Sequence, residues 1–177
     1  MDKKKVMDYF RTVLNYPSTK IFHNAMYDVC FIRAAGLKIN GTIVDTMIAG
    51  SLVNENRFRY DLGSLGRDYL GKGKNEAVLL ETAKQWGIDP KSEMYKLPAM
   101  YVGEYAERDA ELTLELWQEM KKQMLAEEVT SIFELETELF PCLVDMRFLG
   151  VRVDVEAANQ LKHKLLTEEK ECLQKVK

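Results

Sequence analysis

Two pairs of polar residues, each four positions apart, are the candidates for chemistry in this sequence. Asn24 and Asp28 lie in the stretch HNAMYDVCF, and Tyr105 and Asp109 lie in EYAERDAELT. Residues four apart on a helix share a face about one turn apart, so each pair can direct two polar groups at one point. Mg²⁺ binds carboxylate oxygens from more than one segment together with waters, and a nearby phenol can hold an attacking water. Two facing helices that carry these pairs could supply part of a divalent-cation site.

Each pair also has an ordinary structural interpretation. Asn24 is a good N-cap for the helix that follows it, and Tyr105 can be a core aromatic. At average residue usage, either pattern arises by chance on the order of once in two or three chains of this size. Their arrangement favours function, because Asp28 comes directly after an expected strand and Tyr105 and Asp109 lie on a later, polar helix.

The elements that must position these residues follow from the hydrophobic periodicity. Helices are expected over residues 2–15, 26–35, 46–52, 62–70 and 75–86, the last one capped by Asn75. Short strands are expected over 19–23 and 42–45. A helical pattern then runs from about residue 100 through 128 toward 149, with breaks marked by Pro141 and Gly150, and a charged amphipathic helix begins at 155. The chain therefore reads as α/β, with too few strands for a stable sheet.

Composition excludes several classes of protein. The 177 residues carry a net charge of −3, so there is no overall basic field for holding nucleic acid. The three cysteines lack CxxC spacing and there are only two histidines, which argues against a zinc or redox site. The N-terminus has no apolar signal core and no run approaches membrane-spanning length, so an intracellular protein without a membrane partner is expected.

The polar pairs belong to longer stretches that resemble a known family. HNAMYDVCFIRAAG resembles the second exonuclease motif of the proofreading 3′–5′ exonuclease domain in family A DNA polymerases. VDTMIAGSLVN and RYDLGSLGRDYLG are similar to blocks that follow in that family, and VGEYAERDAELTLELW resembles its third motif in the tyrosine form. ELETELFPCLVDMRFLGVRVDVEAANQL resembles the start of the polymerase thumb. The resemblance covers nearly the whole chain from about Lys20.

The resemblance implies a fold and a division into domains. Residues 1–128 would form a partial 3′–5′ exonuclease domain with a ribonuclease H-like α/β fold. Residues 129–177 would form the start of a thumb-like helical region. The implied setting is DNA replication and proofreading in the cytoplasm of a bacterial or phage-infected cell, with the rest of the polymerase chain as a partner.

The resemblance also implies a two-metal mechanism that uses Mg²⁺ or Mn²⁺. Asp109 would ligate the metal on the nucleophile side, and Asp28 would hold the second metal through water. Tyr105 would orient the attacking water. Two divalent ions would help to generate the hydroxide nucleophile and stabilise charge on the attacking and leaving oxygens.

Three further residues would bind the DNA substrate in this interpretation. Asn24 and Tyr27 would contact the frayed single-stranded 3′ end, and Arg59 would meet a phosphate. Arg59 can equally be a solvated loop charge. Stacking and backbone contacts of this kind need little sequence specificity.

The family's first motif, Asp-x-Glu on an opening strand, does not occur before Asn24. Two such strings occur later, Asp109-Ala110-Glu111 and Asp154-Val155-Glu156. The first lies on a helix, where residues two apart do not share a face, and Asp154 is a better candidate for a helix cap. We therefore expect a fragment with an N-terminally incomplete sheet and an incomplete two-ion site, with little activity unless an N-terminal segment complements it.

Two alternative functions remain open from the sequence. The chain could be a non-catalytic nucleic-acid-binding or assembly module from a split or truncated polymerase. It could also be a free-standing exonuclease of the same superfamily that acts on RNA, although the thumb-like stretch after Glu134 argues against this.

Overall fold

The strands and helices of the chain follow the expected order closely. The structure, a computed structural model, describes residues 2–74 and 76–176, so the expected cap at Asn75 lies outside the described residues. The N-terminal elements are α1 Lys3–Asn15, β1 Lys20–Phe22, α2 Ala25–Ala34, β2 Ile43–Asp45, α3 Thr46–Val53, α4 Leu62–Leu70 and α5 Ala77–Trp86. A 3₁₀ turn η1 Met94–Lys96, α6 Ala99–Ala126, α7 Thr130–Leu149 and α8 Val155–Val176 complete the chain.

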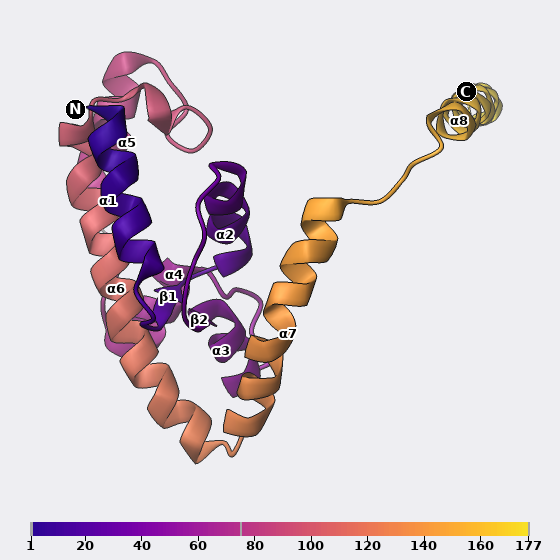
Figure 1. Ribbon diagram of the computed structural model, residues 1–177. Helices are drawn as coiled ribbons and strands as arrows, with labels where there is room; N and C mark the ends of the chain where they lie inside the picture. The colour runs from indigo at the N-terminus through magenta and orange to yellow at the C-terminus, as the bar shows by residue number, and fades with distance from the viewer. Residues whose placement is uncertain (1, 75, 177) are drawn as a thin grey trace. The chain divides into compact units, whose positions relative to one another are not determined.

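The two strands pair in parallel, with Lys20 opposite Ile43 and Phe22 opposite Asp45. The chain crosses from β1 to β2 through α2 (Figure 1). Since parallel strands end at the same edge of a sheet, the segments after Phe22 and Asp45 begin side by side. The helices α2 and α3 therefore start next to each other at the carboxyl edge of the sheet. The observed architecture is α/β, as expected, with mostly helical content.

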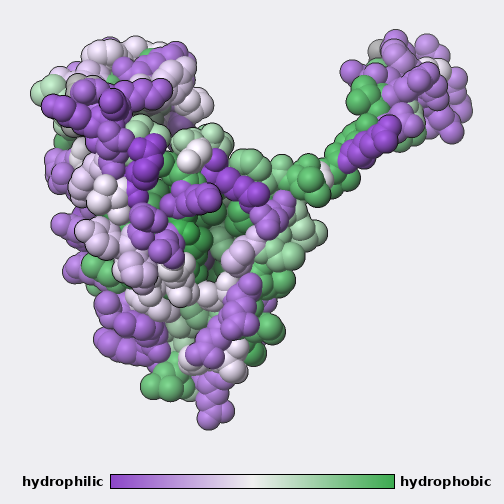
Figure 2. Space-filling view, in the orientation of Figure 1, coloured by the Kyte–Doolittle hydropathy of each residue, from purple (hydrophilic) through white to green (hydrophobic). Residues whose placement is uncertain are grey.

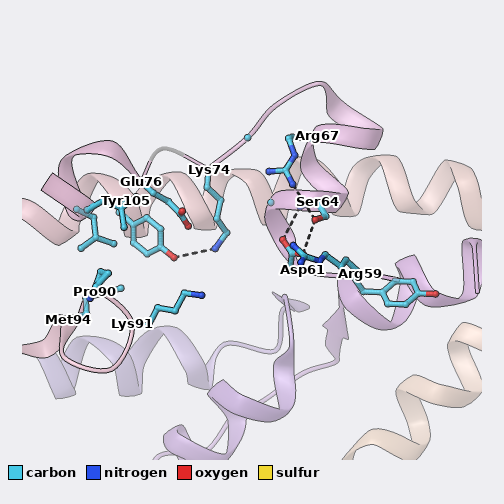
Figure 3. A pocket seen from close by; sticks show the side chains of 15 residues that line it. Arg59, Asp61, Ser64, Arg67, Lys74, Glu76, Pro90, Lys91, Met94 and Tyr105 are labelled. Atoms are coloured by element: carbon cyan, nitrogen blue, oxygen red, sulfur yellow. Dashed lines mark hydrogen bonds between the residues drawn. The ribbon is translucent and has the colours of Figure 1, made fainter. Parts of the chain in front are cut away.

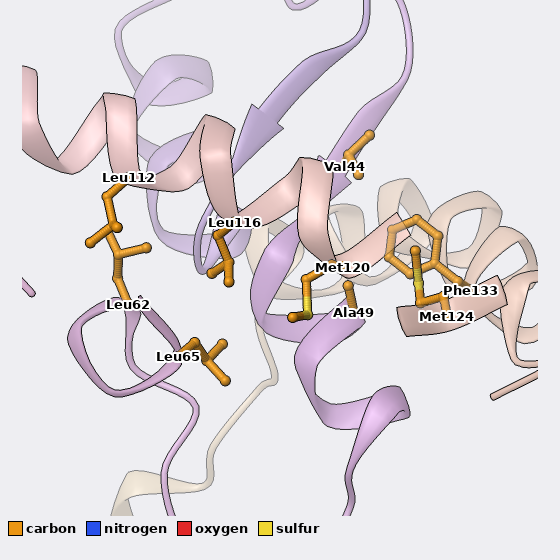
Figure 4. Packing of buried hydrophobic residues seen from close by; sticks show 9 residues of the cluster. All are labelled: Val44, Ala49, Leu62, Leu65, Leu112, Leu116, Met120, Met124 and Phe133. Atoms are coloured by element: carbon orange, nitrogen blue, oxygen red, sulfur yellow. The ribbon is translucent and has the colours of Figure 1, made fainter. Parts of the chain in front are cut away.

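The main core lies where α6 packs against α3 and α4 (Figure 4). One stripe of α6 is fully or almost fully buried: Leu112, Leu116, Met120 and Met124. A Cβ added to Gly66 of α4 would lie 2.8 Å from the Lys72 carbonyl oxygen and 3.0 Å from Leu112, which explains why only glycine fits there. This close contact fixes the rotation of α6, and therefore the direction in which the preceding turn of that helix presents Asp109.

The expected break at Pro141 is wrong, because α7 continues through that residue to Leu149. The interruption comes earlier, between α6 and α7, where Glu128 has a left-handed backbone with φ 58°. The fixed φ of proline is compatible with a helix. Proline inside a helix costs one backbone hydrogen bond, because it has no N–H to donate. Phe140 and Val144, on either side of Pro141, are buried in a cluster with Ala25 and Val29, and this packing stabilises the helix across the proline.

Two compact units make up the chain, residues 1–144 and 145–177. In the second unit, the Asp154 carboxylate accepts a hydrogen bond from the Ala157 N–H at 2.9 Å, which confirms that Asp154 caps the last helix. The described residues of α8 are all exposed. In the first unit, hydrophobic side chains also reach the surface over α7 (Figure 2), including Ile132, Leu135 and Leu139. Across the described ranges, no helix is both long and apolar enough to cross a bilayer.

Candidate active site

The start of α2 is held by Asp45, the last residue of β2. The Asp45 carboxylate accepts hydrogen bonds from the backbone N–H groups of Asn24 at 2.9 Å, Ala25 at 2.7 Å and Met47 at 2.8 Å. Its side chain is 5% exposed, so these bonds are shielded from water. One carboxylate thus caps α2 and α3 together and ties both helices to the end of the sheet.

Asn24 occupies the N-cap position of α2, as expected, but its side chain makes no capping hydrogen bond. Its backbone is left-handed, with φ 63° and ψ 52°, a conformation that asparagine tolerates better than most residues. Because Asp45 performs the capping, the ordinary structural interpretation of the Asn24 amide does not hold. That amide is left at the surface of a cavity.

Asp28 and Asp109 line the same cavity, which has a volume of about 720 Å³. Asn24 and Asp28 reach it from α2, and Asp109 reaches it from α6. The walls of this cavity, named here the carboxylate cavity, also include Asp61 and Lys74. The two sequence pairs are therefore brought together in part. Tyr105 lines a neighbouring cavity, which shares Lys74 with this one.

Lys74 joins the two members of the second pair. Its Nζ lies 2.8 Å from Asp109 Oδ2, donates to the Tyr105 hydroxyl at 3.2 Å and lies 5.3 Å from the centre of the Tyr105 ring. Burial lowers the Lys74 pKa, but its hydrogen bonds with Asp109 and Tyr105 and the charge of Asp109 outweigh burial and raise the pKa overall. Sequence reasoning missed Lys74, because the string GKGK is typical of a flexible turn.

Burial determines the hydrogen bonding and protonation of the other polar side chains in this region. Asp109 Oδ1 is buried and has no hydrogen-bond partner among the described residues. Burial raises the pKa of the Tyr105 phenol above its usual value, so this group is neutral at pH 7. Glu111, the other acidic residue of the Asp-x-Glu string on α6, is 67% exposed and pairs with Arg108. Asp109 and Glu111 therefore face different surroundings, as their spacing predicts.

His23 is a further cavity residue that sequence reasoning did not single out. Its Nδ1 lies 2.9 Å from the Thr46 hydroxyl, which itself donates to the Phe22 carbonyl oxygen at 3.1 Å. The hydroxyl has one proton, so it accepts from His23, and the ring proton lies on Nδ1. Burial lowers the His23 pKa, so the ring is neutral at pH 7. The ring therefore fixes the end of β1 without adding charge to the cavity.

Tyr27 and Arg59 lie outside the carboxylate cavity. Tyr27 is 58% exposed on α2, and its ring packs against Phe31 with centroids 4.8 Å apart. It is not among the lining residues of either cavity. Arg59 lines the neighbouring cavity together with Tyr105. Both side chains are exposed, as a contact with a flexible single strand requires.

The carboxylates of the cavity are candidate ligands for a divalent cation. Within residues 2–74 and 76–176, no group of three or more His, Cys, Asp or Glu side chains has the geometry to hold a metal ion. Mg²⁺ nevertheless binds proteins through as few as one or two carboxylates and keeps several waters. Asp28 and the unpartnered buried Oδ1 of Asp109 fit a hydrated divalent ion of this kind, whereas Lys74 occupies Asp109 Oδ2.

The thermal stability of an Asp28 variant tests whether this cavity binds a divalent ion. Burial raises the Asp28 pKa, and the charge of Asp45 adds to this, against a lowering by a backbone hydrogen bond. A carboxyl whose pKa is higher in the folded state stabilises the fold most below its unfolded pKa. That contribution is lost as the pH rises through the folded pKa. At pH 7, we therefore expect Asp28→Asn to raise the melting temperature in EDTA and to remove part of the stabilisation by Mg²⁺.

The melting temperatures of the parent chain and of Asp28→Asn are measured by thermal unfolding in EDTA and in Mg²⁺. Glu156→Gln is a matched control, because Glu156 lies in the first turn of exposed α8. A lower melting temperature for Asp28→Asn in EDTA, or equal Mg²⁺ stabilisation of variant and parent, would contradict the assignment.

Comparisons with known proteins place the chain in a family. A family described as 3′–5′ exonuclease matches residues 1–125. The chain is 31% identical over 156 residues to a DNA-directed DNA polymerase of Pseudomonas phage M6, covering 87% of this chain and 24% of that protein. It is 32% identical to DNA polymerase DpoZ of Vibrio phage phiVC8, covering 82% of this chain and 26% of that protein. It is 26% identical to DNA polymerase I of Chloroflexus aurantiacus, covering 83% of this chain and 15% of that protein. The chain thus spans about a quarter of the length of these phage relatives.

Proposed function

This chain belongs to the 3′–5′ exonuclease family of family A DNA polymerases, and we propose on that basis that it contributes to hydrolysis at a single-stranded DNA 3′ end. The proposed role is removal of terminal nucleotides during replication and proofreading, on a ribonuclease H-like fold. The observation that carries this proposal is that Asp28 and Asp109, from distant parts of the sequence, line one cavity.

In the proposed mechanism, Asp109 would hold one divalent ion and Asp28 would hold a second through water. Such ions activate a water molecule at neutral pH and stabilise charge on the attacking and leaving oxygens. The two carboxylates supply hard oxygen ligands, which suit Mg²⁺ or Mn²⁺. Lys74 would have to release Asp109 Oδ2 for the carboxylate to serve in this way.

The side chains around the ions would position the substrate. Tyr105, neutral at pH 7, can donate one hydrogen bond and accept another, which suits it to orient the attacking water. Asn24 and Tyr27 would hold the frayed end, with the Asn24 amide at the cavity and the Tyr27 ring available for stacking on a base. Arg59 would neutralise a phosphate. Each of these assignments is a proposal.

The described carboxylates of the cavity are too few to complete the coordination of two ions. We therefore expect this chain alone to release nucleotides slowly or not at all. A segment that adds a strand bearing Asp-x-Glu, supplied in trans, should restore release in a Mg²⁺-dependent manner. The measurement is nucleotide release from a labelled single-stranded oligonucleotide, with the chain alone, the segment alone and the two mixed.

Two controls make this complementation informative. The segment with its Asp-x-Glu changed to Asn-x-Gln should bind the chain but should not restore release. An RNA oligonucleotide of the same sequence tests whether the substrate is DNA. Full activity of the chain alone would contradict the proposal that its metal site is incomplete.

One observation favours a second candidate function, that of a non-catalytic nucleic-acid-binding or assembly module. Lys74 pairs with Asp109, and the described residues offer no cluster of three metal-ligating side chains. A module of this kind would bind single-stranded DNA in EDTA and gain no activity from any complementing segment. The same complementation experiment therefore separates the two functions.

A further inference from the structure

A second cavity adjoins the carboxylate cavity and has a volume of about 1030 Å³. It lies between the start of α4, the turn that carries Lys74, the helix α5 and the loop before α6 (Figure 3). It shares Tyr60, Asp61 and Lys74 with the carboxylate cavity. A chain of linked groups could therefore occupy both cavities at once.

The lining of this second cavity is rich in positive charge, although the whole chain carries a net charge of −3. The cationic side chains are Arg59, Arg67, Lys74 and Lys91, and the acidic ones are Asp61 and Glu76. Figure 3 shows the side chains of Lys74 and Lys91 extending into the space between Tyr105 and the Asp61–Ser64 turn. The cavity thus combines an excess of positive charge with room for a ligand.

Some of the charged side chains in this cavity form an ion pair or cap a helix, and others do not. Lys74 pairs with Asp109, and the Asp61 carboxylate caps α4 by accepting from the Ser64 N–H at 3.0 Å and the Ser64 hydroxyl at 2.8 Å. Among the described residues, Arg59 and Lys91 have no carboxylate within ion-pair distance, and Arg67 donates to the neutral Ser64 hydroxyl at 3.3 Å. The charges of Arg59 and Arg67 act on the nearby Asp61 carboxylate.

The cavity also has an apolar wall, which Lys91 borders. It is formed by Leu79, Leu80, Pro90 and Met94 together with the ring of Tyr105. Cationic groups and an apolar wall in one cavity suit a ligand that has an anionic part and a flat apolar part. A nucleotide unit has both, because its phosphate is anionic and its base can lie against apolar or aromatic side chains.

We propose that this second cavity is a nucleotide subsite, in which Arg59, Arg67 and Lys91 bind a phosphate and the apolar wall receives a base. The nucleotide belongs to the single strand whose reacting end lies in the carboxylate cavity. This inference rests on the proposed function, and it adds Arg67, Lys91 and the apolar wall to the substrate site. The shared lining at Tyr60 and Lys74 provides the continuity that a strand requires.

The test is binding of fluorescein-labelled oligothymidylates of increasing length, measured by anisotropy in EDTA so that no hydrolysis occurs. Arg67→Gln and Lys91→Gln should each weaken binding several-fold. Each should also reduce the slope of log affinity against log salt by about 0.7, the value for one phosphate contact on a single strand. Lys84→Gln is the matched control, because Lys84 is exposed on α5 but does not line the cavity. Thermal unfolding of each variant confirms that it is folded.

The outcomes separate this inference from the proposed function. If the parent chain binds DNA but Arg67→Gln and Lys91→Gln behave like Lys84→Gln, the subsite is overturned and the proposed function stands. If the parent chain binds no oligothymidylate, the proposed substrate itself fails. The affinity for free thymidine monophosphate is measured in the same variants. If the two variants lose affinity only for this mononucleotide and keep that for the oligonucleotides, the cavity binds released product and the strand assignment is overturned.

Discussion

Replacing Asp109 with Asn should lower nucleotide release by the complemented protein by about a hundredfold or more, the usual effect of removing one group that stabilises charge in a transition state. Asn keeps the size of the side chain but removes the negative charge. In the proposed mechanism this charge binds a divalent ion directly. The measurement is the rate of Mg²⁺-dependent release from a single-stranded 3′ end, with the complementing segment in excess.

A purely structural role for Asp109 must be separated from this one. Asp109→Asn leaves the ammonium of Lys74 half-buried without its anionic partner, which destabilises the fold for a reason unrelated to catalysis. The double variant Lys74→Met/Asp109→Asn removes both charges and should regain much of the lost stability. If Asp109 binds metal, the double variant stays inactive. Recovery of activity in the double variant would show that Asp109 serves only to hold Lys74.

Replacing Asp45 with Ala should lower the free energy of unfolding by about 3 kcal/mol or more. Three backbone N–H groups lose their acceptor in a place that is shielded from water, and each unsatisfied buried donor costs about 1–3 kcal/mol. The loss also frees the starts of α2 and α3 from the sheet. Because α2 carries Asn24 and Asp28, the carboxylate cavity should lose its shape together with the fold.

Urea denaturation of a graded series makes this prediction specific. Asp45→Asn keeps an oxygen that can replace Oδ1, which accepts from Asn24 and Met47, but it turns a donor toward the Ala25 N–H. Its stability should therefore lie between those of the parent and Asp45→Ala. Asp89→Ala is the control, because Asp89 also accepts two backbone N–H bonds but is exposed to water. Equal losses in Asp45→Ala and Asp89→Ala would contradict the account.

Local patterns in the sequence predicted most of the elements that carry the site. The turn signals and apolar runs around Asn24 and Asp45 predicted the two strands, and the structure confirms them within one or two residues. The hydrophobic periodicity predicted that Asp28 and Asp109 lie on helices, and the structure confirms this. These predictions depend on neighbours in the sequence, so local reasoning reaches them.

The contacts that complete the site depend on residues far apart in the sequence. Nothing near Asp45 indicates that its carboxylate caps a helix that begins twenty residues earlier. Lys74 reaches Asp109 across thirty-five positions, and only the packing of α4 on α6 brings the two together. The continuation of α7 through Pro141 likewise depends on a distant contact, the burial of Phe140 and Val144 against Ala25 and Val29. Local periodicity carries no information about such contacts.

The proposed function depends on the binding of divalent cations by Asp28 and Asp109 in one cavity. Titration with paramagnetic Mn²⁺, followed in the amide NMR spectrum, tests this directly and requires neither activity nor a complementing segment. We expect selective broadening of residues around the carboxylate cavity, including Asn24, Asp28, Asp109 and Thr113. This broadening should be lost in both Asp28→Asn and Asp109→Asn. Broadening confined to exposed acidic segments such as α8, or unchanged broadening in the two variants, would contradict the proposal.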